Sequence, residues 1–201
     1  LKNKFISGMR KGVVDGISVI ELELPYSNSD NFFRRTSLFI KFSIAGIKIA
    51  LTESYDLLFA TSTPLTAGVP GIIAKIVKRK YFIFEIRDLW PELPKAMGVI
   101  SNPFILKAMD ILESISYGMA DKCIALAPGI AHGVTRKFPH KDVIIIPNGS
   151  DEIDLIKSES RTNNFIAAFT GAHGQANGLH AVLDVAVLLK RNNDLDIEFP
   201  F

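Results

Sequence analysis

Three charged residues interrupt and end an apolar run in the sequence. Phe82 to Ile86 is apolar except for Glu85, and Arg87 and Asp88 follow it directly. A charged group that is buried without a partner costs several kcal/mol, so a strand that ends in charges normally ends at water or at a ligand. The three charges therefore mark a candidate site, and an ion pair that only holds the loop is the alternative.

A glycine-rich segment supplies a second candidate for chemistry. Gly171 to Gly178 follows an expected strand and precedes an expected helix. In that context backbone N–H groups and the helix dipole can hold a phosphate. The spacing of the glycines differs from G-x-G-x-x-G, which argues against a dinucleotide-binding Rossmann domain.

Strands and helices alternate along the chain, and these elements must position the candidate residues. The expected strands are residues 17–24, 56–60, 81–86, 122–126, 143–146, 165–170 and 196–199. The expected helices are residues 32–52, 64–78, 103–119, 129–138 and 177–191. Short apolar strands that alternate with helices indicate an α/β fold whose parallel sheet is covered on both faces.

Ligands of open parallel sheets bind at the carboxyl ends of the strands. Four expected strands end in unusual segments, at residues 61–64, 85–88, 127–129 and 147–149. The fold would place all four at one edge of the sheet. For the Pro-Gly and Asn-Gly pairs, ordinary caps and turns are the favoured alternative.

The length of 201 residues favours one complete domain and part of another. Residues 1–150 are expected to form the first domain, and the polar residues 151–164 a linker. Strand and helix alternate again from residue 165, so residues 165–201 are expected to begin a second α/β domain.

Composition excludes several classes of function. The net charge of +2 lacks the basic character of a nucleic-acid-binding protein. Cys123 is the only cysteine, which excludes an intrachain disulfide and a cysteine zinc site and favours a buried thiol in a reducing, cytoplasmic compartment. The four histidines lack H-E-x-x-H spacing, so no metal site is predicted. No apolar segment of the kind found in signal peptides follows Leu1, so we expect no signal peptide.

Four motifs together resemble glycosyltransferase family 4, which has the GT-B fold and uses nucleotide sugars. They are FEIRDLWPE at residues 84–92, ALAPGI at 125–130, IIPNG at 145–149 and TGAHGQANGL at 170–179. The likeness runs from about Asp15 to the end of the sequence. It is greatest to the fucosaminyltransferase-like members that build bacterial surface polysaccharides such as lipopolysaccharide.

The resemblance implies two Rossmann-like domains, the first binding mainly the acceptor and the second mainly a nucleoside diphosphate sugar. It implies glycosyl transfer with retention of configuration, to a glycan or a polyprenyl-linked acceptor, with no cofactor and no metal ion. It also implies a β-α unit before Asp15 and further donor-binding motifs after Phe201. We therefore expect the natural protein to be an enzyme and the 201-residue chain by itself to be inactive.

The resemblance also assigns roles to individual residues. The catalytic candidates are Arg87 and Asp88, the donor-binding candidates are Gly171, His173, Gly174, Asn177, Asn148 and Gly149, and the acceptor-binding candidates are Thr63, Glu85 and Trp90. Many members have a His-Asp pair where this chain has Arg87 and Asp88. Arginine is charged at any ordinary pH and would bind a phosphate or acceptor oxygen rather than act as a base. Asp88 would orient Arg87 or accept from a sugar hydroxyl, with a structural Arg-Asp pair as the alternative.

The phosphate loop departs from the family as well. Many members place an Arg and a Lys where this chain has Ala172 and Asn177. Main-chain amides and His173 would then contribute more of the anion binding. Two other classes stay open: a GT-B nucleotide-sugar epimerase, and a non-enzymatic nucleotide-binding module.

The expected helix from Phe32 to Thr52 suggests a location. Arg34, Lys41 and Lys48 recur at intervals of seven and share one helical face. A basic amphipathic helix can lie on an anionic membrane, here the inner face of the plasma membrane. A core-packed helix with a solvated basic stripe is the alternative. Two lysines within about 20 residues argue against a membrane-spanning helix.

Overall fold

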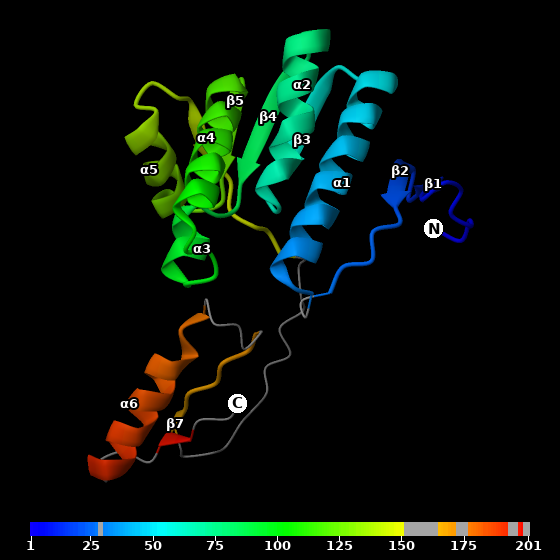
Figure 1. Ribbon diagram of the computed structural model, residues 1–201. Helices are drawn as coiled ribbons and strands as arrows, with labels where there is room; N and C mark the ends of the chain where they lie inside the picture. Colours follow the sequence, from blue (N-terminus) through cyan, green and yellow to red (C-terminus); the bar gives the residue numbers. More distant parts are fainter. Residues whose placement is uncertain (28–29, 151–164, 172–176, 193–196, 199–201) are drawn as a thin grey trace. The chain divides into compact units, whose positions relative to one another are not determined.

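The computed structural model describes residues 1–27, 30–150, 165–171, 177–192 and 197–198 (Figure 1). The chain divides into two compact units, Leu1–Asn148 and Gly149–Phe201. The linker expected at residues 151–164 lies outside the described residues.

The first unit contains a parallel sheet of four strands in the order β3-β4-β5-β6. The strands are β3 (Leu57–Thr61), β4 (Tyr81–Ile86), β5 (Lys122–Ala125) and β6 (Val143–Ile145). The helices are α1 (Phe32–Thr52), α2 (Gly68–Lys78), α3 (Glu92–Ala96), α4 (Pro103–Met119) and α5 (Pro128–Lys137). The predicted α/β class is confirmed, and the arrangement is compatible with a Rossmann-like fold.

The predicted boundaries of α1, β4 and α4 are confirmed to the residue. The helix predicted for residues 64–78 is instead a 3-10 turn, η1 (Leu65–Ala67), that leads into α2. The five-residue helix α3 was not predicted. It begins directly after Pro91, in a segment for which no helix or strand was predicted.

Residues 17–24 were predicted to form a strand of the parallel sheet, and this is wrong. β2 (Ile17–Leu22) pairs antiparallel with the unpredicted strand β1 (Met9–Val14), and neither joins the parallel sheet. Asp15 and Gly16 connect the two strands, and both have positive φ. An Asp-Gly pair favours this kind of two-residue hairpin turn, so the sequence carries a local signal for the hairpin of β1 and β2.

One face of the parallel sheet is buried beneath helices. Phe82, Phe84 and Ile86 of β4 are fully buried on this face, in one core with residues of α2, α4 and α5. The packing is close: a Cβ built on Gly71 of α2 would lie 2.1 Å from the Phe82 ring. These helices fix the position of β4 and of the loop that follows it.

The opposite face of the sheet is largely exposed in the described part of the chain. Leu57, Phe59, Tyr81 and Ile144 retain 43%, 50%, 41% and 45% of their accessible surface. The prediction that both faces are covered is therefore wrong for the described residues. The strands follow one another in a single direction across the sheet, and right-handed crossovers then place every connecting helix on the same face.

The amino end of the sheet is held by Asp121. Its carboxylate accepts a hydrogen bond from the Phe82 N–H at 2.8 Å and pairs with the Lys75 ammonium. Partial burial by itself would raise the pKa of this carboxyl, but the hydrogen bonds from Lys75 and Phe82 outweigh that effect and lower the pKa. A carboxyl with a lowered pKa stabilises the fold at neutral pH, and this contribution is lost as the pH falls through the lowered value.

Asp121→Asn should therefore lower the free energy of unfolding by about 1 kcal/mol at pH 7. The difference from wild type should shrink as the pH falls from about 5 to about 2, because the wild-type carboxyl becomes protonated. Urea unfolding at several pH values measures both quantities. A difference that stays constant with pH would contradict the assigned ion pair.

The second unit contains a short parallel pair, β7 (Phe165–Ile166) and β8 (Ile197–Glu198), and helix α6 (Leu179–Asn192). The strand predicted for residues 165–170 is thus limited to its first two residues. The helix predicted for residues 177–191 begins two residues later, after Gly178 with φ of 62°. Among the described residues, no helix combines the length and the hydropathy needed to cross a membrane.

Candidate functional site at the carboxyl edge of the sheet

Ser62 joins the ends of two neighbouring strands. Its N–H donates to the Glu85 carbonyl at 2.9 Å, and its hydroxyl oxygen accepts from the Arg87 N–H at 2.9 Å. The side chain of Ser62 is fully buried. The segments after β3 and β4, which the sequence had marked separately, therefore form one hydrogen-bonded edge.

Glu85 lies on the open side of β4, and Arg87 follows the strand directly. Parallel register pairs Thr61 with Glu85, while Ile86 points into the covered core. Arg87 Nη1 lies 3.5 Å from Glu85 Oε1, and its side chain keeps 43% of its accessible surface. Glu85 thus lies on the side of β4 opposite the core, because alternate residues of a strand point to opposite faces, and it keeps 15% of its side-chain surface. The Arg87 guanidinium is thus half-exposed and paired with a carboxylate.

Asp88 does not hold Arg87 in place. Within the part of the chain that the structure describes, Asp88 makes no hydrogen bond or ion pair, and the partner of Arg87 is Glu85. The predicted structural Arg87–Asp88 pair and the orienting role for Asp88 are therefore wrong in this structure. The other predicted role for Asp88, acceptance from a ligand hydroxyl, stays a prediction.

Two other predicted acceptor residues flank this edge. Thr63 is exposed, and its N–H donates to the Thr61 carbonyl at 3.0 Å. Trp90 is partly buried, and its indole Nε1 is the one buried side-chain nitrogen or oxygen among the described residues that lacks a hydrogen-bond partner. The peptide bonds Thr63–Pro64 and Trp90–Pro91 are both cis.

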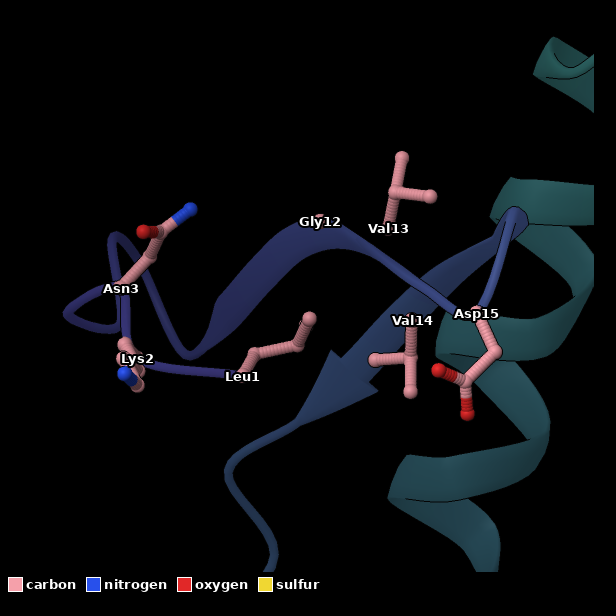
Figure 2. A pocket seen from close by; sticks show the side chains of 7 residues that line it. All are labelled: Leu1, Lys2, Asn3, Gly12, Val13, Val14 and Asp15. Carbon is pink, nitrogen blue, oxygen red and sulfur yellow. The ribbon is translucent and has the colours of Figure 1, made fainter.

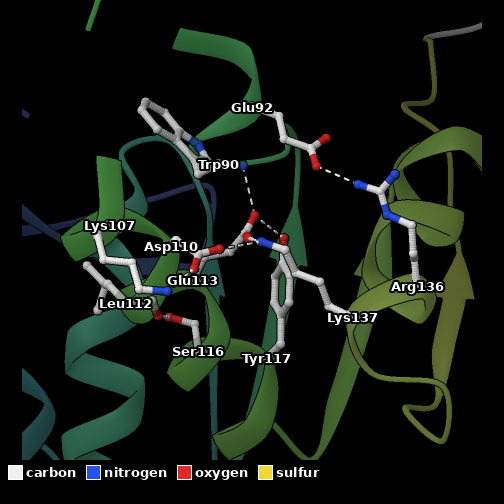
Figure 3. A network of polar contacts seen from close by, with 10 residues as sticks. All are labelled: Trp90, Glu92, Lys107, Asp110, Leu112, Glu113, Ser116, Tyr117, Arg136 and Lys137. Carbon is white, nitrogen blue, oxygen red and sulfur yellow. Dashed lines mark hydrogen bonds and ion pairs between the residues drawn. The ribbon is translucent and has the colours of Figure 1, made fainter. Parts of the chain in front are cut away.

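A buried carboxylate holds the loop after β4 (Figure 3). Glu113 of α4 is 1% exposed, and its Oε1 accepts from the Trp90 N–H at 2.8 Å and from the Tyr117 hydroxyl at 2.6 Å. Its Oε2 pairs with the Lys137 ammonium of α5. The loop that carries Arg87 and Asp88 is thereby fastened to two helices.

A chain of ion pairs leads from Glu113 to the surface. Lys137 also pairs with Asp110 at 3.0 Å, and Asp110 pairs with Lys107 at 3.2 Å. Burial would lower the pKa of Lys137, but hydrogen bonds to Glu113 and Asp110 outweigh it and raise the pKa. Burial, reinforced by the Glu113 charge, raises the pKa of Tyr117. Lys137 therefore stays charged and Tyr117 stays neutral at physiological pH.

The predicted donor-binding residues are divided between the two units. Asn148 ends the first unit and is exposed, and Gly149 begins the second. Gly171 and Asn177 are exposed in the second unit, whereas His173 and Gly174 lie outside the described residues. Among the described candidates of the first unit, hydrogen bonds join the segments after β3 and β4.

Two residues behind the edge, Glu113 and Lys137, were not predicted, and Ser62 lies in the predicted segment 61–64 but had been assigned no role. For Glu113 a signal was available, because it lies among Ile111, Leu112 and Ile115 on a helix. A carboxylate with apolar neighbours on a helix indicates a buried, partnered group. Ser62 and Lys137 have partners far away in sequence, so no local pattern could have identified them.

Three other features were candidates for a site: a surface hollow, the cysteine and possible metal ligands. A hollow of about 490 Å³ on the β1–β2 hairpin is lined by Leu1, Lys2, Asn3, Gly12, Val13, Val14 and Asp15 (Figure 2). Lys2 and Asp15 lie at opposite ends of it, so its polar groups do not converge as in a ligand site. Cys123 is fully buried as predicted, and burial raises the pKa of its thiol to about 11. Among the described residues no three His, Cys, Asp or Glu side chains gather in a possible metal site.

Comparison with known proteins does not identify a family for this chain. Neither a scan against protein-family models nor a search of curated proteins found a match for the chain.

Proposed function

We propose that the protein is a retaining glycosyltransferase of the GT-B fold that uses a nucleoside diphosphate sugar. Its acceptor is a glycan or a lipid-linked sugar used for cell-surface polysaccharide. The proposal rests on the four sequence motifs that resemble glycosyltransferase family 4, and on the geometry of the segment that carries the first of them. The location that fits this function is the cytoplasmic face of the membrane.

One observation carries the proposal. The half-exposed Arg87 guanidinium lies at the carboxyl end of β4, and its own main-chain N–H is fixed by the buried Ser62 hydroxyl. Ligands of open parallel sheets bind at this edge. A half-exposed cation on an anchored main chain supports binding of a diphosphate or of an anionic acceptor there.

Each residue then has a distinct part in transfer. As the bond from sugar to diphosphate breaks, negative charge grows on the leaving phosphate, and preorganised cations and N–H dipoles stabilise it. In the first unit Arg87 is the candidate cation. The resemblance assigns the N–H dipoles to residues 171–178. Glu85, 3.5 Å from Arg87, is its ion-pair partner on the same strand end. Asp88 and Thr63 are candidates to bind acceptor hydroxyls.

The test is nucleotide binding and sugar transfer by the full natural polypeptide. Isothermal titration calorimetry should detect binding of UDP or GDP and none of NAD. Incubation with the matching nucleotide sugar and a lipid-linked sugar acceptor should give a product whose anomeric configuration equals that of the donor. Conversion of the nucleotide sugar without any acceptor would favour the epimerase, and binding without turnover would favour a non-enzymatic module. Binding of NAD alone would reject the proposal.

A further inference from the structure

Asn148 and Gly149 form an asparagine-glycine pair on the exposed segment that follows β6. One main-chain hydrogen bond, from the Ile146 N–H to the Ala125 carbonyl at 3.0 Å, continues the sheet beyond this strand. After it, Asn148 and Gly149 are exposed and lie outside any helix or strand. Among the described residues neither of them has a hydrogen-bond partner. The side-chain amide and the main-chain nitrogen that follows it are therefore both available to react.

This pair has the chemistry for spontaneous loss of ammonia. The Gly149 nitrogen gives up its proton to hydroxide and attacks Cγ of Asn148, so that a C–N bond forms and the Cγ–Nδ2 bond breaks as ammonia leaves. Water then opens the succinimide at either carbonyl and gives aspartate or isoaspartate. Glycine favours the attack because it has no Cβ and its backbone adopts many conformations. The reaction is confined to one peptide group and needs no reactant besides water.

Three other asparagines lack one of these conditions. The side chain of Asn31 accepts a hydrogen bond from a main-chain N–H at the start of α1. Asn102 precedes a proline, which has no N–H to lose. Asn177 and Gly178 form the same dipeptide, but Gly178 has φ of 62° and its carbonyl accepts a hydrogen bond at the start of α6. The structure thus distinguishes Asn148 from all three.

We propose that Asn148 is a site of spontaneous deamidation, and that the product binds a nucleoside diphosphate less tightly. The effect on binding rests on the proposed function, in which Asn148 belongs to the donor site. Deamidation replaces a neutral amide, which can donate a hydrogen bond, by a carboxylate, which cannot. The new negative charge also repels a diphosphate. The affinity for the donor therefore falls as the protein ages.

The first experiment measures the modification in the 201-residue chain and needs no activity. The folded chain is incubated at mildly alkaline pH in water labelled with heavy oxygen and is then digested with trypsin in ordinary water. The peptide of residues 142–157, in which Asn148 is the only asparagine, should appear as labelled aspartate and isoaspartate forms. The peptide of residues 96–107, in which Asn102 is the only asparagine, should stay intact. An unmodified Asn148 peptide would overturn the proposal.

Two comparisons separate the effect of the structure from that of the dipeptide. In the folded chain Asn148 should convert about fivefold faster than Asn177, because one hydrogen bond at Gly178 must open first, whereas in urea the two rates should be equal. Gly149→Ala adds a Cβ where no atom lies within 4 Å, so the fold should be unchanged and most of the conversion should be lost. Equal rates at the two pairs in the folded chain, or full conversion in Gly149→Ala, would contradict the proposal.

The second experiment measures the affinity of the full natural polypeptide for UDP and GDP by isothermal titration calorimetry. Asn148→Asp should lower the affinity about fivefold, which corresponds to about 1 kcal/mol of like-charge repulsion at contact distance in water. Asn102→Asp is the matched control, because the change in charge is the same and aspartate caps a helix as well as asparagine does. This control should bind like the wild type.

The outcomes of this titration separate the inference from the proposed function. Equal affinity of Asn148→Asp and the wild type would overturn the effect on donor binding. If the wild type itself bound neither nucleotide, the proposed function and the effect on donor binding would both fail. Deamidation of Asn148 would still be decided by the first experiment, which measures only the peptide.

Discussion

Lys137→Met is expected to lower the free energy of unfolding by about 3 to 5 kcal/mol. The ammonium of Lys137 is the only cation paired with Glu113 in the described structure, and Glu113 is 1% exposed. Its loss leaves a buried carboxylate without a compensating charge. Because Glu113 also binds the Trp90 N–H, the loop that carries Arg87 should loosen as well. Urea unfolding gives the free energy, and hydrogen exchange of the Trp90 amide reports the loop.

Two further variants make this prediction specific. Lys137→Met/Glu113→Gln should recover most of the loss, because a glutamine oxygen can still accept from Trp90 and Tyr117 while no charge remains buried. Lys107→Met removes a lysine that is 70% exposed and paired only with Asp110, and it should change stability by less than about 1 kcal/mol. If the double variant were no more stable than Lys137→Met, packing of the lysine stem rather than charge would explain the effect.

Arg87→Ala is expected to lower turnover of the proposed glycosyl transfer by about 10²- to 10³-fold, the cost typical of losing one donor that stabilises growing negative charge. Stability should hardly change. The hydrogen bond to Ser62 comes from the main-chain N–H and survives the substitution. Within the described residues the only side-chain partner of Arg87 is Glu85, in a half-exposed pair that contributes about 0 to 1 kcal/mol. Steady-state kinetics and thermal unfolding measure the two quantities.

Arg136→Ala is the matched control for Arg87. Arg136 is 61% exposed and has one ion pair, with Glu92 at 2.6 Å, so the change in charge and exposure is similar. Turnover should be almost unaffected in this variant. Arg87→Lys keeps the charge without the planar fork and should recover turnover only in part. If Arg87→Ala lost stability and activity together, the residue would serve the fold and not the reaction.

Local signals explain why some elements could be predicted closely. Asn31 accepts from the Arg34 N–H at the start of α1, and Asn102, followed by Pro103, caps α4. These are strong helix-start patterns, and they need no information from elsewhere in the chain. The hairpin at Asp15 and Gly16 had an equally local signal.

The candidate site was predictable only in part. Parallel topology alone predicts that segments following β3 and β4 meet at one edge, and Ser62 joins them there. The choice of Glu85 rather than Asp88 as the partner of Arg87 depends on strand alternation. Residues two apart on a strand project from the same face, so Glu85 is on the correct side.

By itself the sequence determined the α/β class, the boundaries of α1, β4 and α4, and the edge of the sheet at which polar residues gather. Each depends on the order and local pattern of residues along the chain. Only the tertiary structure decided which sheet face is covered, because Phe82, Ile83 and Phe84 are all apolar and conceal the alternation between core and open face. It alone also identified Lys137 as the partner of Glu113, since residues 24 apart meet only when α4 and α5 pack together.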